Sequence, residues 1–170
     1  STINQYQVNN PKLNPKFIFA FPAYNMRNNE IGAILGIEQL KRLDVNNKIR
    51  TENHDRFLKT INSDAFQTNF FTKGSSNYAF NLVLNRKDDA LMARLMKTLD
   101  VHGVEYRKGS AGGGNQLRQP YLRNVVGENA WLHYPVTEHI HFYGMYIGNF
   151  PDLSFEEVDE IVSIINSAVL

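Results

Sequence analysis

The sequence predicts an α/β fold in which a long linking helix leads into a small C-terminal α/β sandwich, with helices on one face of a short sheet. Three features of the 170 residues carry this prediction. Apolar residues recur at helical spacing over about 30 residues. The spacing then changes to the alternation of a strand. The chain ends on a capped amphipathic helix, so helices and short strands follow one another along the second half.

The first third of the chain is expected to be mostly helical after an irregular start. Residues 1–16 are polar and rich in Asn and Pro, and residues 17–27 are apolar but broken by Pro22. A helix of about 30 residues would reach ~45 Å, which is typical of an element that joins two parts of a protein. The segment 45–47 is a candidate kink. The apolar positions of this predicted helix are Ile31, Ile34, Leu35, Leu40, Leu43, Ile49, Phe57, Leu58 and Ile61.

A linker and a strand–helix pair follow. Residues 62–76 are rich in Asn, Ser, Thr and Gly, which indicates a linker. Residues 77–84 alternate and predict a strand. A helix is expected from Asp88 to a stop at Gly103. One face of the strand would carry Tyr78, Phe80, Leu82 and Leu84. The buried face of the helix would carry Leu91, Met92, Leu95, Met96 and Leu99.

The remaining elements are two short strands and the last helix. We expect strands at 104–107 and 140–147. Ser154 and Glu157 form a capping box, and Leu153 can pack on Val158 as a hydrophobic staple. The buried stripe of the last helix would be Val158, Ile161, Val162 and Ile165.

Composition excludes several classes of protein and site. The formal net charge is +1, so no global field attracts nucleic acid or an anionic membrane, and we expect neither as a partner. The chain has no cysteine, which rules out disulfides and thiolate metal sites and fits a cytoplasmic location. No run approaches the ~20 apolar residues of a membrane span, and the first residues do not have the pattern of a signal peptide.

The stretch RKGSAGGGNQLRQPY, from Arg107 to Tyr121, is a candidate anion site. Backbone amides of Gly112, Gly113 and Gly114 have no side chains to keep a ligand away. Arg107 and Arg118 add guanidinium groups suited to phosphate oxygens. No GK[ST] follows, so this is not a P-loop. A surface loop with solvated arginines explains the same pattern equally well.

The pair His139 and His141 could share a face of the strand expected at 140–147. With Glu138 they could hold a metal, but no third ligand follows at a convincing spacing, so we expect no metal site. The simpler interpretation is that one histidine faces a polar cleft and the other pairs locally. No ordered catalytic triad or nucleophile elbow is present.

Just before the long helix, Asn25 and Arg27 could bind an anion, because a helix N-terminus favours negative charge. The alternative is that Asn25, Asn28 and Asn29 only cap the helix.

Taken together, these stretches resemble the DegT/StrS-type sugar aminotransferases, vitamin-B6 enzymes of the aspartate-aminotransferase fold (fold type I). The segment FAFPAYNMRNNEIGAILGIEQLKRLD is similar to the family's NxR motif and its helix AAxGxxQLxxLD, although Gly32 replaces the first alanine. The matching residues are Asn25, Arg27, Ala33, Gly36, Gln39, Leu40, Leu43 and Asp44. Two later stretches resemble the GDP-4-keto-6-deoxy-D-mannose 3-dehydratase branch: GVEYRKGSAGGGNQLRQPYLR and EHIHFYGMYIGNFPDLSFEEVDEI.

The resemblance implies a division of the chain and a set of site residues. Residues 1–61 would be the end of the large domain with the linking helix, and residues 62–170 the small C-terminal domain. Asn25 and Arg27 would bind the PLP or PMP cofactor or nearby phosphates. The nucleotide part of a GDP-linked keto-sugar would meet substrate-binding residues Glu105, Arg107, Gly112, Gly113, Gly114 and Arg118.

The resemblance also implies that no catalytic residue lies in this chain. In the family the cofactor-site lysine, or the histidine that replaces it in the dehydratases, precedes the NxR motif, and Lys12 and Lys16 lack the surrounding motif. We therefore expect the C-terminal part of a homodimeric dehydratase, inactive by itself and unable to bind the cofactor alone. The alternatives are a 4-aminotransferase on the same kind of sugar, and a non-catalytic module that binds nucleotide sugars or a partner protein.

Overall fold

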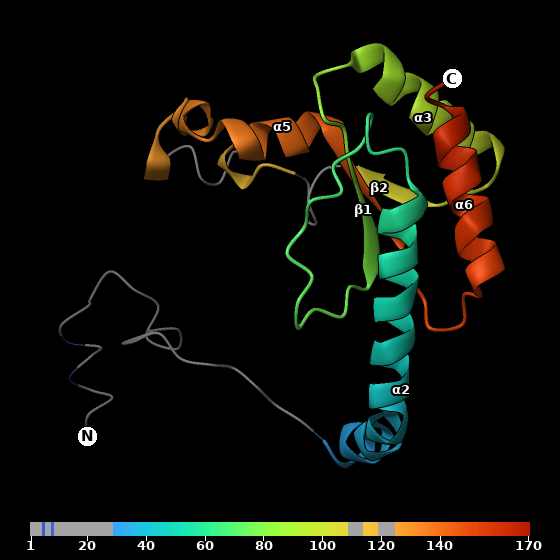
Figure 1. Ribbon diagram of the computed structural model, residues 1–170. Coiled ribbons are helices and arrows are strands. Elements are labelled where there is room, and N and C mark those ends of the chain that lie inside the picture. The colour runs from blue at the N-terminus through green and yellow to red at the C-terminus, as the bar shows by residue number, and fades with distance from the viewer. Residues whose placement is uncertain (1–4, 6–7, 9–28, 109–113, 119–124) are drawn as a thin grey trace. The chain divides into compact units, whose positions relative to one another are not determined.

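The structure, a computed structural model, describes residues 5, 8, 29–108, 114–118 and 125–170 (Figure 1). The chain divides into two compact units, Ser1–Leu40 and Lys41–Leu170. The domain boundary that the sequence predicts after residue 61 remains a prediction.

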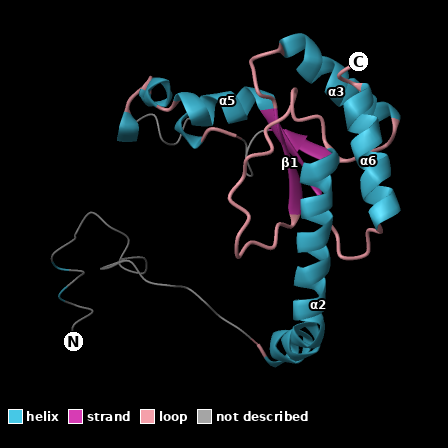
Figure 2. Ribbon diagram, viewed as in Figure 1, coloured by secondary structure: helices cyan, strands magenta, loops and turns pink. Residues whose placement is uncertain are grey.

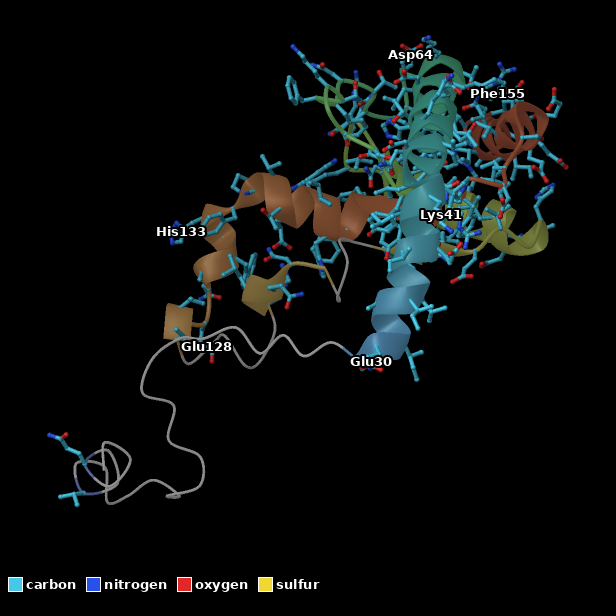
Figure 3. The ribbon with its side chains drawn as sticks, turned by 90° about the horizontal axis from the view of Figure 1, so that it is seen from below. Glu30, Lys41, Asp64, Glu128, His133 and Phe155 are labelled. Atoms are coloured by element: carbon cyan, nitrogen blue, oxygen red, sulfur yellow. The ribbon has the colours of Figure 1, made fainter. Side chains whose placement is uncertain are left out.

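The long helix is present as α2 (Glu30–Thr60), 31 residues that stay helical through the candidate kink at 45–47. The side-chain Oδ1 of Asn29 accepts a hydrogen bond from the Gly32 amide at 2.8 Å, as expected of a helix-start residue. Large apolar side chains of its N-terminal part are exposed between the labelled Glu30 and Lys41 (Figure 3). They are Ile31, Ile34, Leu35, Ile37 and Leu40.

The sheet, magenta in Figure 2, has three antiparallel strands, β1 (Ala79–Val83), β2 (Tyr106–Lys108) and β3 (Gly144–Gly148). Their order in the sheet is β1-β3-β2. Asn81 of β1 and Arg107 of β2 both pair with Tyr146, so these three residues form one row across the sheet. The alternation predicted for β1 is confirmed at Phe80, which is fully buried. Tyr78 differs, because it precedes the strand and is 61% exposed.

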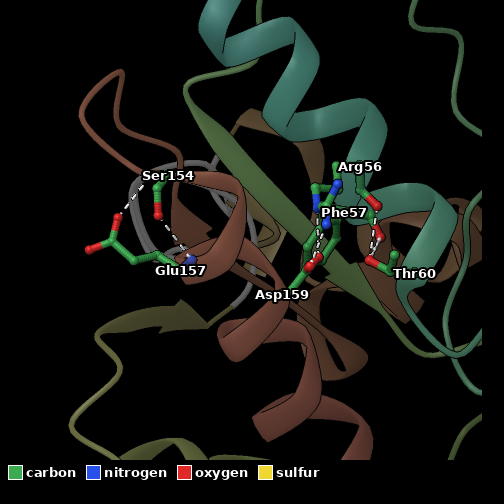
Figure 4. Close-up of polar contacts among 6 residues, drawn as sticks. All are labelled: Arg56, Phe57, Thr60, Ser154, Glu157 and Asp159. Carbon is green, nitrogen blue, oxygen red and sulfur yellow. Dashed lines mark hydrogen bonds and ion pairs between the residues drawn. The ribbon is translucent and has the colours of Figure 1, made fainter.

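Helices α3 (Asp89–Val101) and α6 (Phe155–Ser167) lie side by side, as Figure 1 shows. The predicted capping box is confirmed, because Ser154 and Glu157 bond each other reciprocally at the start of α6 (Figure 4). Helix α3 begins at the expected position, where the Asp88 side chain accepts from the Leu91 amide at 2.8 Å. Helices and sheet share one core, made by Phe57, Phe80, Leu82, Leu95, Leu99, Met145, Ile147, Val158, Val162 and Ile165.

The C-terminal part of α2 is fixed to this core. The ring of Phe57 stacks on Phe80 with centroids 4.6 Å apart. Arg56 forms a bidentate ion pair with Asp159 of α6, with its Nε donating at 2.7 Å (Figure 4). The last turns of the linking helix therefore belong to the same core as the small sheet.

The strand predicted at 140–147 is wrong for its first four residues. Helix α5 (Pro135–Tyr143) runs directly into β3, after the short 3-10 helices η1 (Gln116–Arg118) and η2 (Ala130–His133). Pro135 occupies the first turn, where a missing N–H costs nothing. Gly144 makes the abrupt change possible, because a Cβ there would lie 2.6 Å from the carbonyl oxygen of Ile140.

Candidate functional site

A cleft of about 520 Å³ lies at one end of the sheet, beside the edge strand β2. Its lining comes from β2 and the residues before it, from β3 and the segment after it, and from one residue each before β1 and in α6. They are Tyr78, Gly103, Val104, Glu105, Tyr106, Arg107, Tyr146, Ile147, Gly148, Phe150, Leu153 and Ile161. Two of the predicted substrate-binding residues, Glu105 and Arg107, therefore line this cleft.

Glu105 and Arg107 flank Tyr106, so strand alternation places them on the same side, away from the core that Tyr106 packs against. Both are exposed. Neither forms an ion pair or a side-chain hydrogen bond with any other residue that the structure describes. A carboxylate and a guanidinium without a partner among the described residues can serve a ligand, the first as an acceptor and the second as a donor to phosphate oxygens.

Besides Tyr106, which packs against the core, three aromatic residues line the cleft that were not predicted as site residues: Tyr78, Tyr146 and Phe150. The Tyr78 and Tyr146 rings meet edge to face, 6.1 Å apart at 74°. The alternating pattern assigned Tyr78 to the core face. No local signal joins these three residues, because they become neighbours only when β1 pairs with β3.

The end of the glycine-rich stretch is attached to α5. Arg118 donates from Nε to both carboxylate oxygens of Glu138, at 2.7 and 3.0 Å, and its Nη2 lies 2.6 Å from Oε1. Asn115, almost fully buried, donates to Glu138 Oε2 at 3.1 Å. Burial raises the pKa of Glu138, but the hydrogen bonds from Arg118 and Asn115 and the nearby positive charge outweigh it. The pKa of Glu138 is therefore lowered from its ordinary 4.5.

Aromatic rings complete this cluster. The Arg118 guanidinium lies 3.9 Å from the ring centre of Trp131 and 5.2 Å from that of Phe142, both within the range of cation–π contacts. We call Asn115, Arg118, Trp131, Glu138 and His141 the Glu138 cluster. The role of Arg118 in substrate binding remains a prediction, since its guanidinium meets a carboxylate of its own chain.

Gly114 and His141 belong to the same contact. Gly114 has φ +82°, and a Cβ there would lie 2.0 Å from His141 Nδ1, so only glycine fits. The Asn115 amide donates to the same Nδ1 at 3.0 Å. Of the glycines predicted to bind an anion, Gly112 and Gly113 lie outside the described residues.

The shared face predicted for the two histidines is wrong, because they lie on α5 rather than on a strand. Side chains that are two positions apart on a helix point in nearly opposite directions. His139 Nε2 lies 2.7 Å from the carbonyl oxygen of Leu84, and His141 Nδ1 accepts a hydrogen bond from the Asn115 amide, so each histidine has a partner from a distant part of the sequence. Within the described ranges no three His, Cys, Asp or Glu residues are grouped as a metal site would need.

Asn25 and Arg27, the residues predicted to bind the cofactor, lie outside the described residues. The seven lysines that the structure describes are all exposed, at positions 41, 48, 59, 73, 87, 97 and 108. None of the seven is therefore desolvated by burial, which is one of the two ways in which a lysine that forms a Schiff base has its pKa lowered. No helix within the described parts of the chain is long and apolar enough to cross a membrane.

The family model described as DegT/DnrJ/EryC1/StrS aminotransferase family matches residues 3–166, nearly the whole chain. The chain belongs to this family. The family that the sequence resembles is thereby confirmed.

Two curated relatives are both named GDP-4-keto-6-deoxy-D-mannose 3-dehydratase. The protein from Yersinia pseudotuberculosis is 30% identical over 156 residues, and the protein from Escherichia coli O55:H7 is 25% identical over 150. Each match covers 88% of this chain and 38% of the relative. The chain therefore spans well under half the length of the curated relatives it matches.

Solved structures of the family share the fold. The E. coli GDP-4-keto-6-deoxy-D-mannose-3-dehydratase with bound hydrated PLP superposes with a TM-score of 0.71 at 24% identity, over 94% of this chain and 44% of that one. A putative sugar aminotransferase from Streptococcus pneumoniae, in its PMP form, also reaches 0.71, at 18% identity over 88% of this chain and 37% of that one. These likenesses confirm the predicted fold class of a linking helix and a small α/β domain.

Proposed function

We propose that this chain forms the C-terminal part of a vitamin-B6-dependent enzyme of nucleotide-sugar biosynthesis, which removes the C3 hydroxyl of a GDP-linked 4-keto-6-deoxyhexose. Such sugars would serve deoxysugar, O-antigen or lipopolysaccharide synthesis in the cytoplasm. The observation that carries the proposal is the position of Glu105 and Arg107 at one cleft. The relatives named as dehydratases support it.

The cleft would bind the nucleotide. Guanine has two adjacent N–H donors on its pairing edge, and the Glu105 carboxylate is an acceptor that suits them. Arg107 would bind the diphosphate, since a guanidinium matches phosphate oxygens in geometry and charge. The row Asn81–Tyr146–Arg107 holds Arg107 on the exposed side of the sheet.

The cofactor, PLP or PMP, would supply the electron sink of the reaction. Asn25 and Arg27 are the residues we propose for its phosphate. We propose that the catalytic lysine or histidine comes from another part of the full-length enzyme, because none of the lysines that the structure describes is buried. This chain by itself would then be inactive.

A homodimer fits the exposed apolar side chains of α2. Ile31 and Leu40 are 73% and 67% exposed, and surface of this kind favours association. We propose that this part of the helix is covered in the full-length dimer.

The second candidate is a 4-aminotransferase on a nucleotide-linked 4-ketosugar. The likeness to the S. pneumoniae protein favours it. The cofactor-site residue decides between them: a lysine would indicate the aminotransferase and a histidine the dehydratase.

Calorimetry with GDP tests the proposal. Removing a hydrogen bond to a charged group costs roughly 1.5–3 kcal/mol, so Arg107→Ala and Glu105→Gln should each weaken GDP binding about 10- to 100-fold. Lys97→Ala, an exposed cation of α3 that does not line the cleft, is the matched control and should bind normally. Unchanged GDP affinity in both cleft variants would contradict the proposed nucleotide site.

A further inference from the structure

The cleft has an aromatic side as well as a charged one. Tyr78 and Phe150 are 61% and 59% exposed, which is unusual for rings that stand in a cleft with other aromatic residues. Tyr146 of β3 lies four residues before Phe150 in the sequence, and its ring meets that of Tyr78 edge to face. Exposed rings gathered at one cleft indicate a surface that a ligand covers.

The backbone beneath these rings is fixed by Asn149, which is fully buried. Its amide donates to the carbonyl oxygen of Tyr78 at 2.8 Å. Its side-chain Nδ2 donates to the carbonyl oxygens of Asn77 at 2.8 Å and of Arg50 at 2.9 Å. The segments that carry Tyr78 and Phe150 are therefore held together before any ligand arrives, which lowers the ordering cost of binding.

The ring of Phe150 is positioned by Gly148. A Cβ on Gly148 would lie 2.5 Å from Cζ and 2.6 Å from Cε2 of that ring, so the ring lies directly on the glycine. Replacing Gly148 by alanine would move the end of one side chain without requiring the backbone to shift.

We propose that Tyr78, Tyr146 and Phe150 form an aromatic wall that stacks the purine base of the nucleotide. This inference rests on the proposed function and deepens it. Every base has a π-face, so stacking on such a wall adds affinity without choosing the base. The choice then comes from Glu105, which accepts from the adjacent N–H donors of guanine and faces an acceptor at N1 of adenine. The wall binds the base, and Arg107 binds the diphosphate.

The test is calorimetry of the chain with GDP and, separately, with inorganic pyrophosphate. Stacking on one aromatic residue is worth about 5- to 100-fold in affinity. Phe150→Ala and Tyr78→Ala should each weaken GDP binding by an amount in that range and leave pyrophosphate binding unchanged. Arg107→Ala should weaken both. Phe71→Ala removes a ring that is 89% exposed outside the cleft and should change neither.

Gly148→Ala gives a second, independent arm. It should weaken GDP binding in the parent chain, because it displaces the Phe150 ring. In the Phe150→Ala background it should have no further effect, since no ring is left to displace. Thermal melts of all variants check that the fold is retained, and Phe150→Leu keeps apolar volume without an aromatic face.

The outcomes separate the two proposals. GDP affinity that falls in Arg107→Ala but not in Phe150→Ala or Tyr78→Ala overturns the aromatic wall and leaves the nucleotide site in place. No GDP binding by the parent chain overturns the proposed nucleotide site and the wall with it. Binding by Phe150→Leu equal to that of the parent would show that the ring supplies apolar area only, and would also overturn stacking.

Discussion

Arg107 and Arg118 come from the same basic stretch and reach opposite environments. Arg107 is exposed on the cleft and has no side-chain partner among the described residues, whereas Arg118 is bound by Glu138 and covered by Trp131. A cation next to glycines in a sequence is therefore only a candidate anion site. It remains one after folding only where the fold brings no carboxylate to it.

The two arginines differ because folding gives them different neighbours. Arg107 has Tyr146 as its strand neighbour, a ring without charge. Arg118 meets a carboxylate twenty residues later, and an ion pair with hydrogen bonds from a buried asparagine is stronger than an exposed one. We therefore expect substitutions in the Glu138 cluster to lower stability and substitutions at the cleft to lower binding.

The largest effect on stability is expected for Glu138→Ala. It leaves the Arg118 guanidinium and the buried Asn115 amide without their acceptor, which should lower the free energy of unfolding by about 2–3 kcal/mol. Urea unfolding followed by the emission of Trp131, the only tryptophan, measures it. Asp159→Ala breaks the more exposed pair with Arg56 and should lower the free energy of unfolding by less than Glu138→Ala does. Equal losses in the two variants would contradict the comparison.

Gly114→Ala should come next, at about 2 kcal/mol. The positive φ costs an alanine about 1 kcal/mol, and its Cβ would displace the His141 ring and break the hydrogen bond from Asn115. Gly74→Ala is the matched control, because its φ is +76° but nothing lies within 4 Å of the added Cβ. The two glycines should differ by about one hydrogen bond. If they cost the same, the contact with His141 contributes nothing.

Lowering the pH is expected to reduce the free energy of unfolding by a smaller amount. The pKa of Glu138 is lowered in the folded state, so the folded protein holds fewer protons than the unfolded chain. The stability that Glu138 contributes is fully present above its ordinary pKa of 4.5 and is lost as the pH falls through the lowered value. Urea titrations between pH 6 and pH 3 should show this slope, and Glu138→Gln should show less of it. An unchanged slope in the variant would assign the acid sensitivity to other groups.

The smallest change in stability is expected for Arg107→Ala. An exposed cation with no partner among the described residues should cost less than about 0.5 kcal/mol when removed. The same variant is expected to bind GDP more weakly, so binding and stability separate at this residue. A loss of stability as large as that of Glu138→Ala would show that Arg107 is structural.

Local rules of the chain determined most of the fold. Helical spacing located α2, alternation located β1 at Phe80, and the capping residues Ser154 and Glu157 located the start of α6. These signals involve residues within a few positions of one another, so they can be recognised without knowledge of the tertiary structure. The family motif likewise needs only the order of residues along the chain.

Only the tertiary structure decided where α5 ends and what the charged residues meet. The segment 140–147 has apolar and aromatic residues that suit a strand or a helix, and the contact of His139 with Leu84 lies 55 residues away in sequence. Glu138 reaches Arg118, and Tyr78 reaches Tyr146, through pairings that no local pattern encodes. Glu105 and Arg107 could be named from the sequence, whereas the aromatic rings beside them became neighbours only when β1, β3 and β2 formed one sheet.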